Sequence, residues 1–299
     1  MALSERDLRA IELVEKYHQK NLKENLEEYH KFLDILISLH ETLADENVKI
    51  QQWQKLSEHL LLKFYLHGNT IFHIYSGTEL KSNYIDDKHV SIKILDIPSA
   101  KVLQRAQLEA FLMYHHIYVN PKTEDEKQLR YYAWIYSSLL ERQEFPTKTE
   151  IGKDVIAKDL NTIESIRGIM LNLASFKELN EKQQKALIKT GSKKLFKHWA
   201  TIMEETGFPK NHGFSTLYSI MSSHAHSEGL GIIQLSDTNI FNSEENEIAY
   251  LDVHISKLLV CMMISTIKDL YKSIGVHYNN LPEVLRYDIE LYATLGASL

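Results

Sequence analysis

Apolar residues recur every three or four positions along most of the chain, which is the spacing of amphipathic helices. Glycine and proline, which interrupt helices, are sparse, with 11 and 5 copies in 299 residues. The pattern predicts helices at about residues 4–17, 24–45, 48–75, 99–119, 123–143, 149–176, 181–189, 192–206, 214–226, 247–275 and 281–295. The sequence therefore predicts an all-α protein, folded as a multi-helix bundle.

The segment 247–275 is apolar nearly all round its middle, so we expect it to be the central helix of the core. Residues 78–98 are the least regular part of the chain. They include HVSIKILDI, which alternates like a strand but has no obvious partner strand, and we interpret the region as a structured loop. With no internal repeat or low-complexity linker, we expect one domain, in which residues 1–77 form a helical N-terminal extension and residues 78–299 the main bundle.

Composition excludes some classes of protein. Lys and Arg number 34 and Asp and Glu 40, so the net charge of -6 lacks the basic footprint of a protein that grips duplex DNA. The single Cys261 cannot form a disulfide within the chain. The first residues carry charges where a signal peptide needs an apolar stretch, and no run approaches the roughly 20 apolar residues of a membrane span. We therefore expect a cytoplasmic protein without a membrane partner.

The stretch YSIMSSHAHSEGLG at residues 218–231 carries the first candidate site. Tyr218, Ser222 and His226 are four residues apart and share one face of a helix, where His226 could act as a general acid or base in a cleft. The alternative is that these groups only hydrogen-bond to each other and to backbone carbonyls inside the bundle. His224 lies two residues from His226, which is not the spacing of a zinc pair on a helix, so we expect no metal and no cofactor.

A second candidate lies in the helix at 99–119. Arg105 and Glu109 are one turn apart among apolar neighbours, and a buried arginine needs several acceptors. Arg130 in the following, antiparallel helix could approach the same place. The basic stretch at residues 185–199 could meet phosphates, but its pattern is more typical of a solvated helix face.

Two stretches, DIPSAKVLQRAQLEAFLMYHHIYVNP and FSTLYSIMSSHAHSE, together resemble a family of uncharacterised, mainly bacterial helical proteins. The family's Arg-x-x-x-Glu motif matches Arg105 and Glu109. Its Tyr-x-x-Leu-Ser-x-x-Val-His-type motif matches Tyr218, Ser222 and His226, with methionine and alanine in place of leucine and valine. The resemblance covers about residues 95–275 and implies a polar cluster between helices.

Those proteins are distantly similar to HEPN helical bundles, many of which are metal-independent ribonucleases in defence and toxin systems. That group has Arg, four to six intervening residues and then His on one helix, and this chain lacks that spacing. The resemblance therefore implies nuclease activity only if Arg105 or Arg130, from another helix, stands beside His226.

Two hypotheses follow. In the one that the sequence favours for the whole chain, the protein is a non-catalytic interaction module whose polar cluster is buried and fixes helix register, with a protein partner or a homodimer contact on the N-terminal helices. In the other, it is an enzyme that acts on RNA or a nucleotide. His226 would then be the general acid or base, Arg105 with Arg130 would stabilise phosphate charge, and Glu109, Ser222 and Tyr218 would support them.

Overall fold

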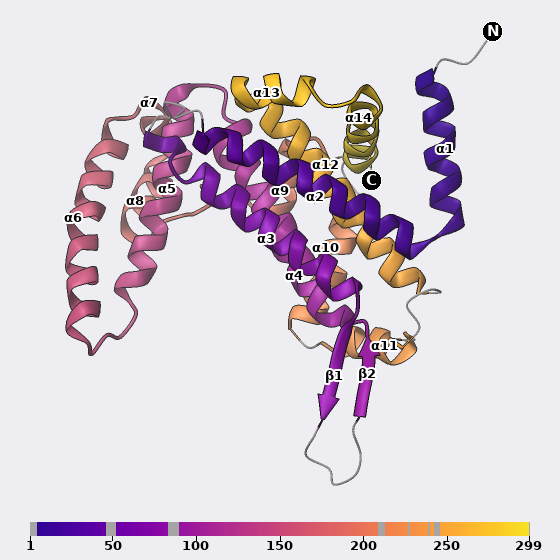
Figure 1. The fold of residues 1–299 in the computed structure, drawn as a ribbon. Coiled ribbons are helices and arrows are strands. Elements are labelled where there is room, and N and C mark those ends of the chain that lie inside the picture. Colours follow the sequence, from indigo (N-terminus) through magenta and orange to yellow (C-terminus); the bar gives the residue numbers. More distant parts are fainter. Residues whose placement is uncertain are drawn as a thin grey trace. The chain divides into compact units, whose positions relative to one another are not determined.

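The computed structural model describes residues 5–45, 52–82, 90–208, 213–226, 228–238, 240–241 and 246–298. These residues form fourteen α-helices, a short 3-10 helix, a π-helix and one two-stranded sheet (Figure 1). The all-α multi-helix fold predicted from the apolar periodicity is thereby confirmed.

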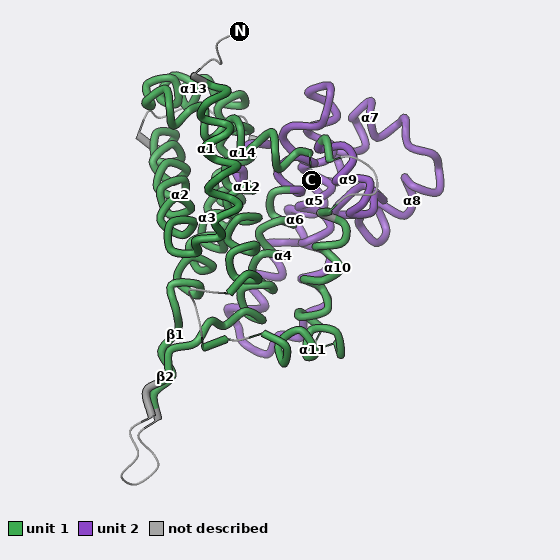
Figure 2. The backbone as a smooth tube through the Cα atoms, turned by 90° about the vertical axis from the view of Figure 1, so that its right-hand side faces the viewer, with its two compact units in different colours: residues 1–49, 58–111, 207–299 green, residues 50–57, 112–206 purple. Residues whose placement is uncertain are grey.

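The chain divides into two compact units (Figure 2). Unit 1 comprises residues 1–49, 58–111 and 207–299, and unit 2 comprises residues 50–57 and 112–206. This division differs from the expected boundary at residues 77 and 78, because α2 packs against α12 and so belongs to the core of unit 1. Unit 2 thus comes from two insertions into unit 1, a short one at residues 50–57 and a long one at residues 112–206.

Unit 1 holds α1 (Glu5–Gln19), α2 (Leu22–Asp45), most of α3 (Ser57–Tyr75) and of α4 (Ile97–Tyr114), and, after the insertion, α10 (Gly213–Ala225), α11 (Gly229–Asp237), α12 (Glu247–Leu270), α13 (Lys272–Asn279) and α14 (Glu283–Ser298). The helix α11 lies within a segment, residues 227–246, for which the sequence predicts only a polar connection. Residues 48–51, the start of the helix expected at 48–75, lie outside the described residues, and α3 begins only at Ser57.

The helix α12 is the centre of unit 1, as its all-round apolar pattern predicts. Asn246 caps its first turn by accepting a hydrogen bond from the Ala249 backbone N–H. It packs against α2, α13 and α14. Among the described helices it alone is long and apolar enough to cross a membrane, but 78% of its apolar window is buried inside the protein, as in the core helix of a globular protein. It ends at Leu270 rather than near Gly275, because Tyr271 adopts an extended conformation from which α13 starts.

The interpretation of residues 78–98 as a loop is wrong. β1 (Thr78–Ser82) pairs antiparallel with β2 (Val90–Ile94), with Leu80 opposite Ile92. Gly77, at a φ of +99°, ends the preceding helix and lets the chain enter the hairpin. The partner strand that the alternating segment lacked is the short stretch TELKS, which has too few apolar residues to be recognised as a strand.

Unit 2 is built from η1 (Gln52–Gln54), the π-helix η2 (His115–Val119), α5 (Glu124–Gln143), α6 (Glu150–Asn172), α7 (Ala174–Lys177), α8 (Glu181–Thr190) and α9 (Trp199–Glu205). Thr123 caps α5, since its hydroxyl accepts from the Glu126 N–H. The antiparallel pair α5 and α6 is tied by a bidentate ion pair between Arg142 and Asp159.

Candidate functional site

Four of the residues singled out in the sequence meet in unit 1, where side chains of α4 contact side chains on and just after α10. Arg105 and Glu109 occupy successive turns of α4, and Tyr218 lies on α10. His226 follows the last residue of α10, but its backbone N–H still bonds to the Ser222 carbonyl, so the four-residue spacing keeps its side chain on the face of Tyr218. The two halves of this cluster are brought together by the fold rather than by the sequence.

Arg105 is the hub of the cluster. Its Nε donates to Glu109 Oε1 at 3.0 Å, and its Nη2 donates to the Tyr218 hydroxyl at 3.2 Å. The guanidinium carbon also lies 5.1 Å from the centroid of the Tyr218 ring. The Tyr218 hydroxyl in turn donates to Glu109 Oε1 at 2.8 Å. Three side chains therefore form a closed triangle that fixes the direction of the guanidinium.

The third donor nitrogen of Arg105, Nη1, points at His226. Arg105 Nη1 lies 3.3 Å from His226 Nε2. A guanidinium can only donate, so Nε2 must present its lone pair, and the proton of the neutral imidazole then sits on Nδ1. The contact thus selects one tautomer of His226 and aims its basic nitrogen at a fixed positive charge.

The cluster is open to solvent. The side chains of Arg105 and Glu109 are 22% and 31% exposed, and His226 is exposed. Partial burial, followed by the hydrogen bond to Glu109, raises the pKa of Tyr218, so its hydroxyl is a neutral donor at physiological pH. Burial lowers the pKa of Arg105, but Tyr218 and Glu109 outweigh it and raise the pKa above its ordinary value. The sequence predicted a buried Arg105 in a dry interior, whereas its side chain lies half-buried at the surface.

Ser222 and His224 have other partners. The Ser222 hydroxyl donates to the Tyr218 carbonyl of its own helix at 2.7 Å. His224 Nε2 lies 3.0 Å from Gln234 Oε1 and links α10 to α11. Ser222 thus supports the backbone of α10, and His224 lies outside the cluster. Among the described residues, no group of three or more His, Cys, Asp or Glu could hold a metal ion.

Arg130 forms a separate cluster in unit 2. Its Nη1 donates to both the carbonyl oxygen and Nδ1 of His116, at 2.9 and 3.1 Å, and its Nη2 donates to Glu126 at 2.5 Å. Glu205 lies 3.6 Å from the guanidinium. Burial and the charge of Arg130 lower the pKa of His116 to about 3. The sequence could not indicate this pairing, because it depends on the π-helix that turns His116 inward.

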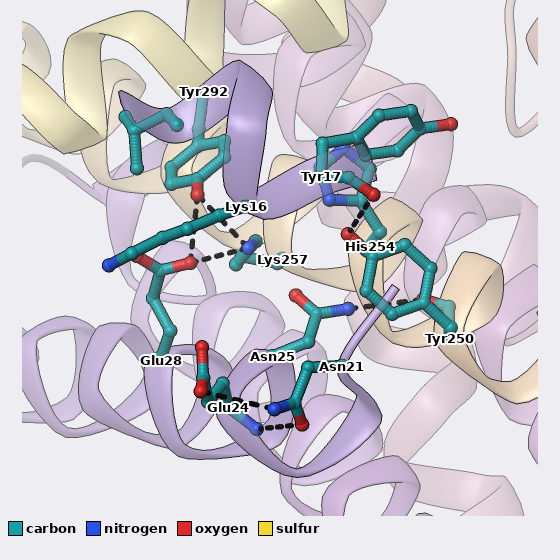
Figure 3. Close-up of a pocket in the computed structure, with 11 residues that line it drawn as sticks. Lys16, Tyr17, Asn21, Glu24, Asn25, Glu28, Tyr250, His254, Lys257 and Tyr292 are labelled. Carbon is teal, nitrogen blue, oxygen red and sulfur yellow. Dashed lines mark hydrogen bonds and ion pairs between the residues drawn. The ribbon is translucent and has the colours of Figure 1, made fainter. Parts of the chain in front are cut away.

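A second polar site in unit 1 was not anticipated from the sequence. A cavity of about 60 Å³ lies between α1, α2, α12 and α14 (Figure 3). At its wall Lys257 Nζ bonds to Glu28 at 2.6 Å and to the Tyr292 hydroxyl at 3.1 Å. Burial and the nearby Lys257 lower the pKa of His254 to about 3. Asn25 Oδ1 and His254 Nδ1, both buried, have no hydrogen-bond partner among the described residues.

Comparison with family models, curated proteins and solved structures finds no match. The functional argument therefore rests on the geometry of the chain itself.

Proposed function

We propose that the cluster of Arg105, Glu109, Tyr218 and His226 is the active site of a metal-independent ribonuclease. The observation that supports this function is the 3.3 Å approach of the exposed His226 imidazole to a fixed guanidinium from a residue 121 positions away. A base beside a cation held in place by two other side chains is the pair that phosphodiester cleavage without a metal requires.

The proposed reaction uses the 2′-hydroxyl of RNA as the nucleophile. A phosphate oxygen replaces His226 as the acceptor of Arg105 Nη1, which neutralises charge on the phosphate and frees the Nε2 lone pair. Nε2 takes the proton of the 2′-hydroxyl, the O2′–P bond forms, and the P–O5′ bond breaks. The 5′-oxygen takes a proton from water or from the His226 imidazolium, leaving a 2′,3′-cyclic phosphate. DNA, which lacks the 2′-hydroxyl, should not be cut.

Glu109 and Tyr218 have a positioning role in this proposal. The carboxylate accepts from both Arg105 Nε and the Tyr218 hydroxyl, so it holds the guanidinium and the phenol in register. Glu109→Gln should weaken this hold while leaving His226 in place. We expect a smaller loss of rate from Glu109→Gln than from changes to Arg105 or His226.

The test is cleavage of a single-stranded RNA of mixed sequence in EDTA. His226→Ala should lower the rate by at least about 100-fold, the lower end of what a general acid or base contributes, while the protein melts like the wild type. His224→Ala is the matched control, because His224 lies on the same helix end but contacts Gln234. Equal loss in both variants would point to damage of α10 and not to loss of a base.

A non-catalytic role is the second candidate, and one observation favours it: every donor nitrogen of Arg105 already has a partner within the cluster. In that case the cluster acts as a clasp between α4 and α10, and the protein functions by binding. Wild-type protein that leaves RNA intact, together with a melting temperature lowered by several degrees in Arg105→Ala, would support the clasp and count against the ribonuclease.

A further inference from the structure

We propose that α1 is an exchangeable arm, and that the α1 helix of a second copy of this chain can replace it in the groove formed by α2, α12 and α14. This arrangement is a domain-swapped dimer. It concerns a face of unit 1 separate from the Arg105 cluster and does not depend on the proposed ribonuclease activity. Four features of α1 carry the inference.

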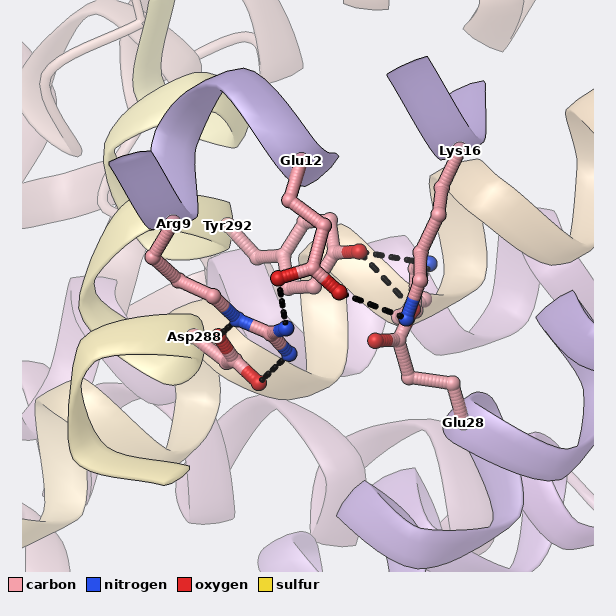
Figure 4. A network of polar contacts seen from close by, with 7 residues as sticks. Arg9, Glu12, Lys16, Glu28, Asp288 and Tyr292 are labelled. Atoms are coloured by element: carbon pink, nitrogen blue, oxygen red, sulfur yellow. Dashed lines mark hydrogen bonds and ion pairs between the residues drawn. The ribbon is translucent and has the colours of Figure 1, made fainter. Parts of the chain in front are cut away.

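The first feature is that charges dock α1. Arg9 binds Asp288 of α14 through two hydrogen bonds of 2.7 Å, and Asp288 is buried (Figure 4). Arg6 lies 3.6 Å from Glu290, and Lys20, just beyond the helix, lies 2.8 Å from Glu247. The arm thus offers basic side chains to acidic partners. The groove selects a helix with this charge pattern, and a second copy supplies an identical one.

The second feature is how little apolar surface α1 buries. Leu13 is its one apolar side chain classed as buried among those described, whereas Leu8, Ile11 and Val14 are between 46% and 53% exposed. A helix that packed as part of the core would bury a whole stripe. Undocking α1 therefore exposes little apolar area of the arm itself, and segments with few buried apolar side chains are those that open most easily.

The third feature is the floor of the groove. The cavity of about 60 Å³ lies directly beneath α1, and Lys16 and Tyr17 of the arm help to line it (Figure 3). The unpartnered Asn25 Oδ1 lies at its wall. The floor residues Glu28, Lys257 and Tyr292 bond to one another without any atom of α1. These three residues therefore keep their arrangement without the arm, whereas Tyr250 donates to the Tyr17 carbonyl and so contacts the arm that is docked, whichever chain supplies it.

The fourth feature is a strained hinge. Lys20 and Asn21 alone separate α1 from α2, and Lys20 has a φ of +51°, in the left-handed region that favours glycine. Asn21 holds the turn by capping α2, because its side chain accepts from the Glu24 N–H. If Lys20 relaxes to helical angles, α1 and α2 merge into one helix over residues 5–45. The arm then points away from its own groove, and only the groove of another molecule can receive it.

The hinge provides the first test, made on exposed residues that leave the fold intact. Lys20→Gly removes the strain of the turn, and Lys20→Ala is its reference because both variants lose the ion pair with Glu247. Asn21→Ala removes the cap. Each change should alter the equilibrium between the turned and the straight hinge about fivefold. Because a dimer has two hinges, its association constant should fall about 25-fold in Lys20→Gly and rise about 25-fold in Asn21→Ala. The measurement is mass by light scattering over a concentration series, after refolding from urea at high concentration.

The second test asks where the arm docks. Chains with Arg9→Asp and chains with Asp288→Arg each oppose like charges when folded alone. Refolded together, they can restore both ion pairs only by exchanging arms, so a heterodimer should form. The double variant Arg9→Asp/Asp288→Arg, which restores the pair within one chain, should behave as the wild type. If Asp288→Arg does not fold, Arg6→Glu with Glu290→Lys carries the same test on exposed residues.

Three results would overturn the proposal. The first is a chain that stays monomeric at every concentration even with Asn21→Ala. The second is a dimer whose association constant is the same in Lys20→Gly and Asn21→Ala. The third is a complementary pair that refolds only to separate monomers. Any of these would assign α1 permanently to its own chain.

Discussion

The most demanding prediction concerns a buried ion pair in the core of unit 1. Lys101 of α4 donates to Asp252 of α12, and their side chains are 7% and 1% exposed. The Tyr75 hydroxyl of α3 donates to the other oxygen of Asp252. Gln104 donates to the Asp252 carbonyl and to the Ser256 hydroxyl. This polar group joins three helices where an apolar core would allow them to slide.

The magnitude follows from what each substitution leaves behind. Asp252→Asn keeps the shape but leaves the Lys101 ammonium buried without a counter-charge, and Lys101→Met leaves the carboxylate with only neutral donors. Breaking a buried pair in this way costs about 3–5 kcal/mol. Replacing both members removes both charges, so Lys101→Met/Asp252→Asn should cost no more than either single change. The coupling between the two sites should therefore reach about 3 kcal/mol.

The assay is urea unfolding followed by far-ultraviolet circular dichroism, with the four proteins compared as a double-mutant cycle. Lys81→Met is the control, because the Lys81 and Glu79 side chains are 64% and 50% exposed and the pair should contribute under about 1 kcal/mol. The reasoning would be refuted by single variants whose free energy of unfolding falls by less than about 1 kcal/mol. It would also be refuted by a double variant whose loss equals the sum of the two single losses.

Three further predictions test other parts of the fold. The pKa of His116 and of His254 is about 3 in the folded protein and about 6.5 in the unfolded chain, so the unfolded chain binds more protons between these two values. Lowering the pH from 7 to 5 should therefore reduce the free energy of unfolding by about 2 kcal/mol for each histidine. A urea midpoint that does not change with pH would contradict this. Amides of α1 should exchange faster in 1 M salt than at low salt, with those of α12 unchanged, because salt screens the ion pairs that dock the arm; hydrogen exchange at constant pH measures this. Gly191→Ala should destabilise more than Gly207→Ala in thermal melts, since both have positive φ but only the first would place its Cβ within 2.8 Å of Ser137 backbone, and equal losses would contradict it.

The helical pattern predicted the fold class because amphipathic periodicity is a local property. The same local rule placed Tyr218 and His226 on one face and Arg105 beside Glu109. The meeting of the two helices is a property of tertiary packing, and only the family resemblance suggested that they share a cluster. His226 and Arg105 lie 121 positions apart, and no pattern within either segment encodes their 3.3 Å approach.

Other features escaped prediction for identifiable reasons. Four of the five residues of the strand TELKS are polar or charged, so the first strand of the hairpin gave no alternating apolar signal. The sequence of α1 is that of an ordinary amphipathic helix, although all the apolar residues of its stripe except Leu13 are largely exposed in the structure. The left-handed Lys20 has no sequence signature, since glycine or asparagine is expected there.

The inserted position of unit 2 sets an order for folding during synthesis. Residues 112–206 are contiguous and are complete on the ribosome well before α12 emerges. The apolar face of α2, which packs on α12, must instead wait for about 200 further residues, or about 10–40 s at 5–20 residues per second. In the last part of that interval, between residues 206 and 247, a nascent chain carries a finished unit 2 and an unfinished unit 1. The aggregation risk of this protein should therefore lie in its first helices, and chaperones that hold nascent chains should engage them there.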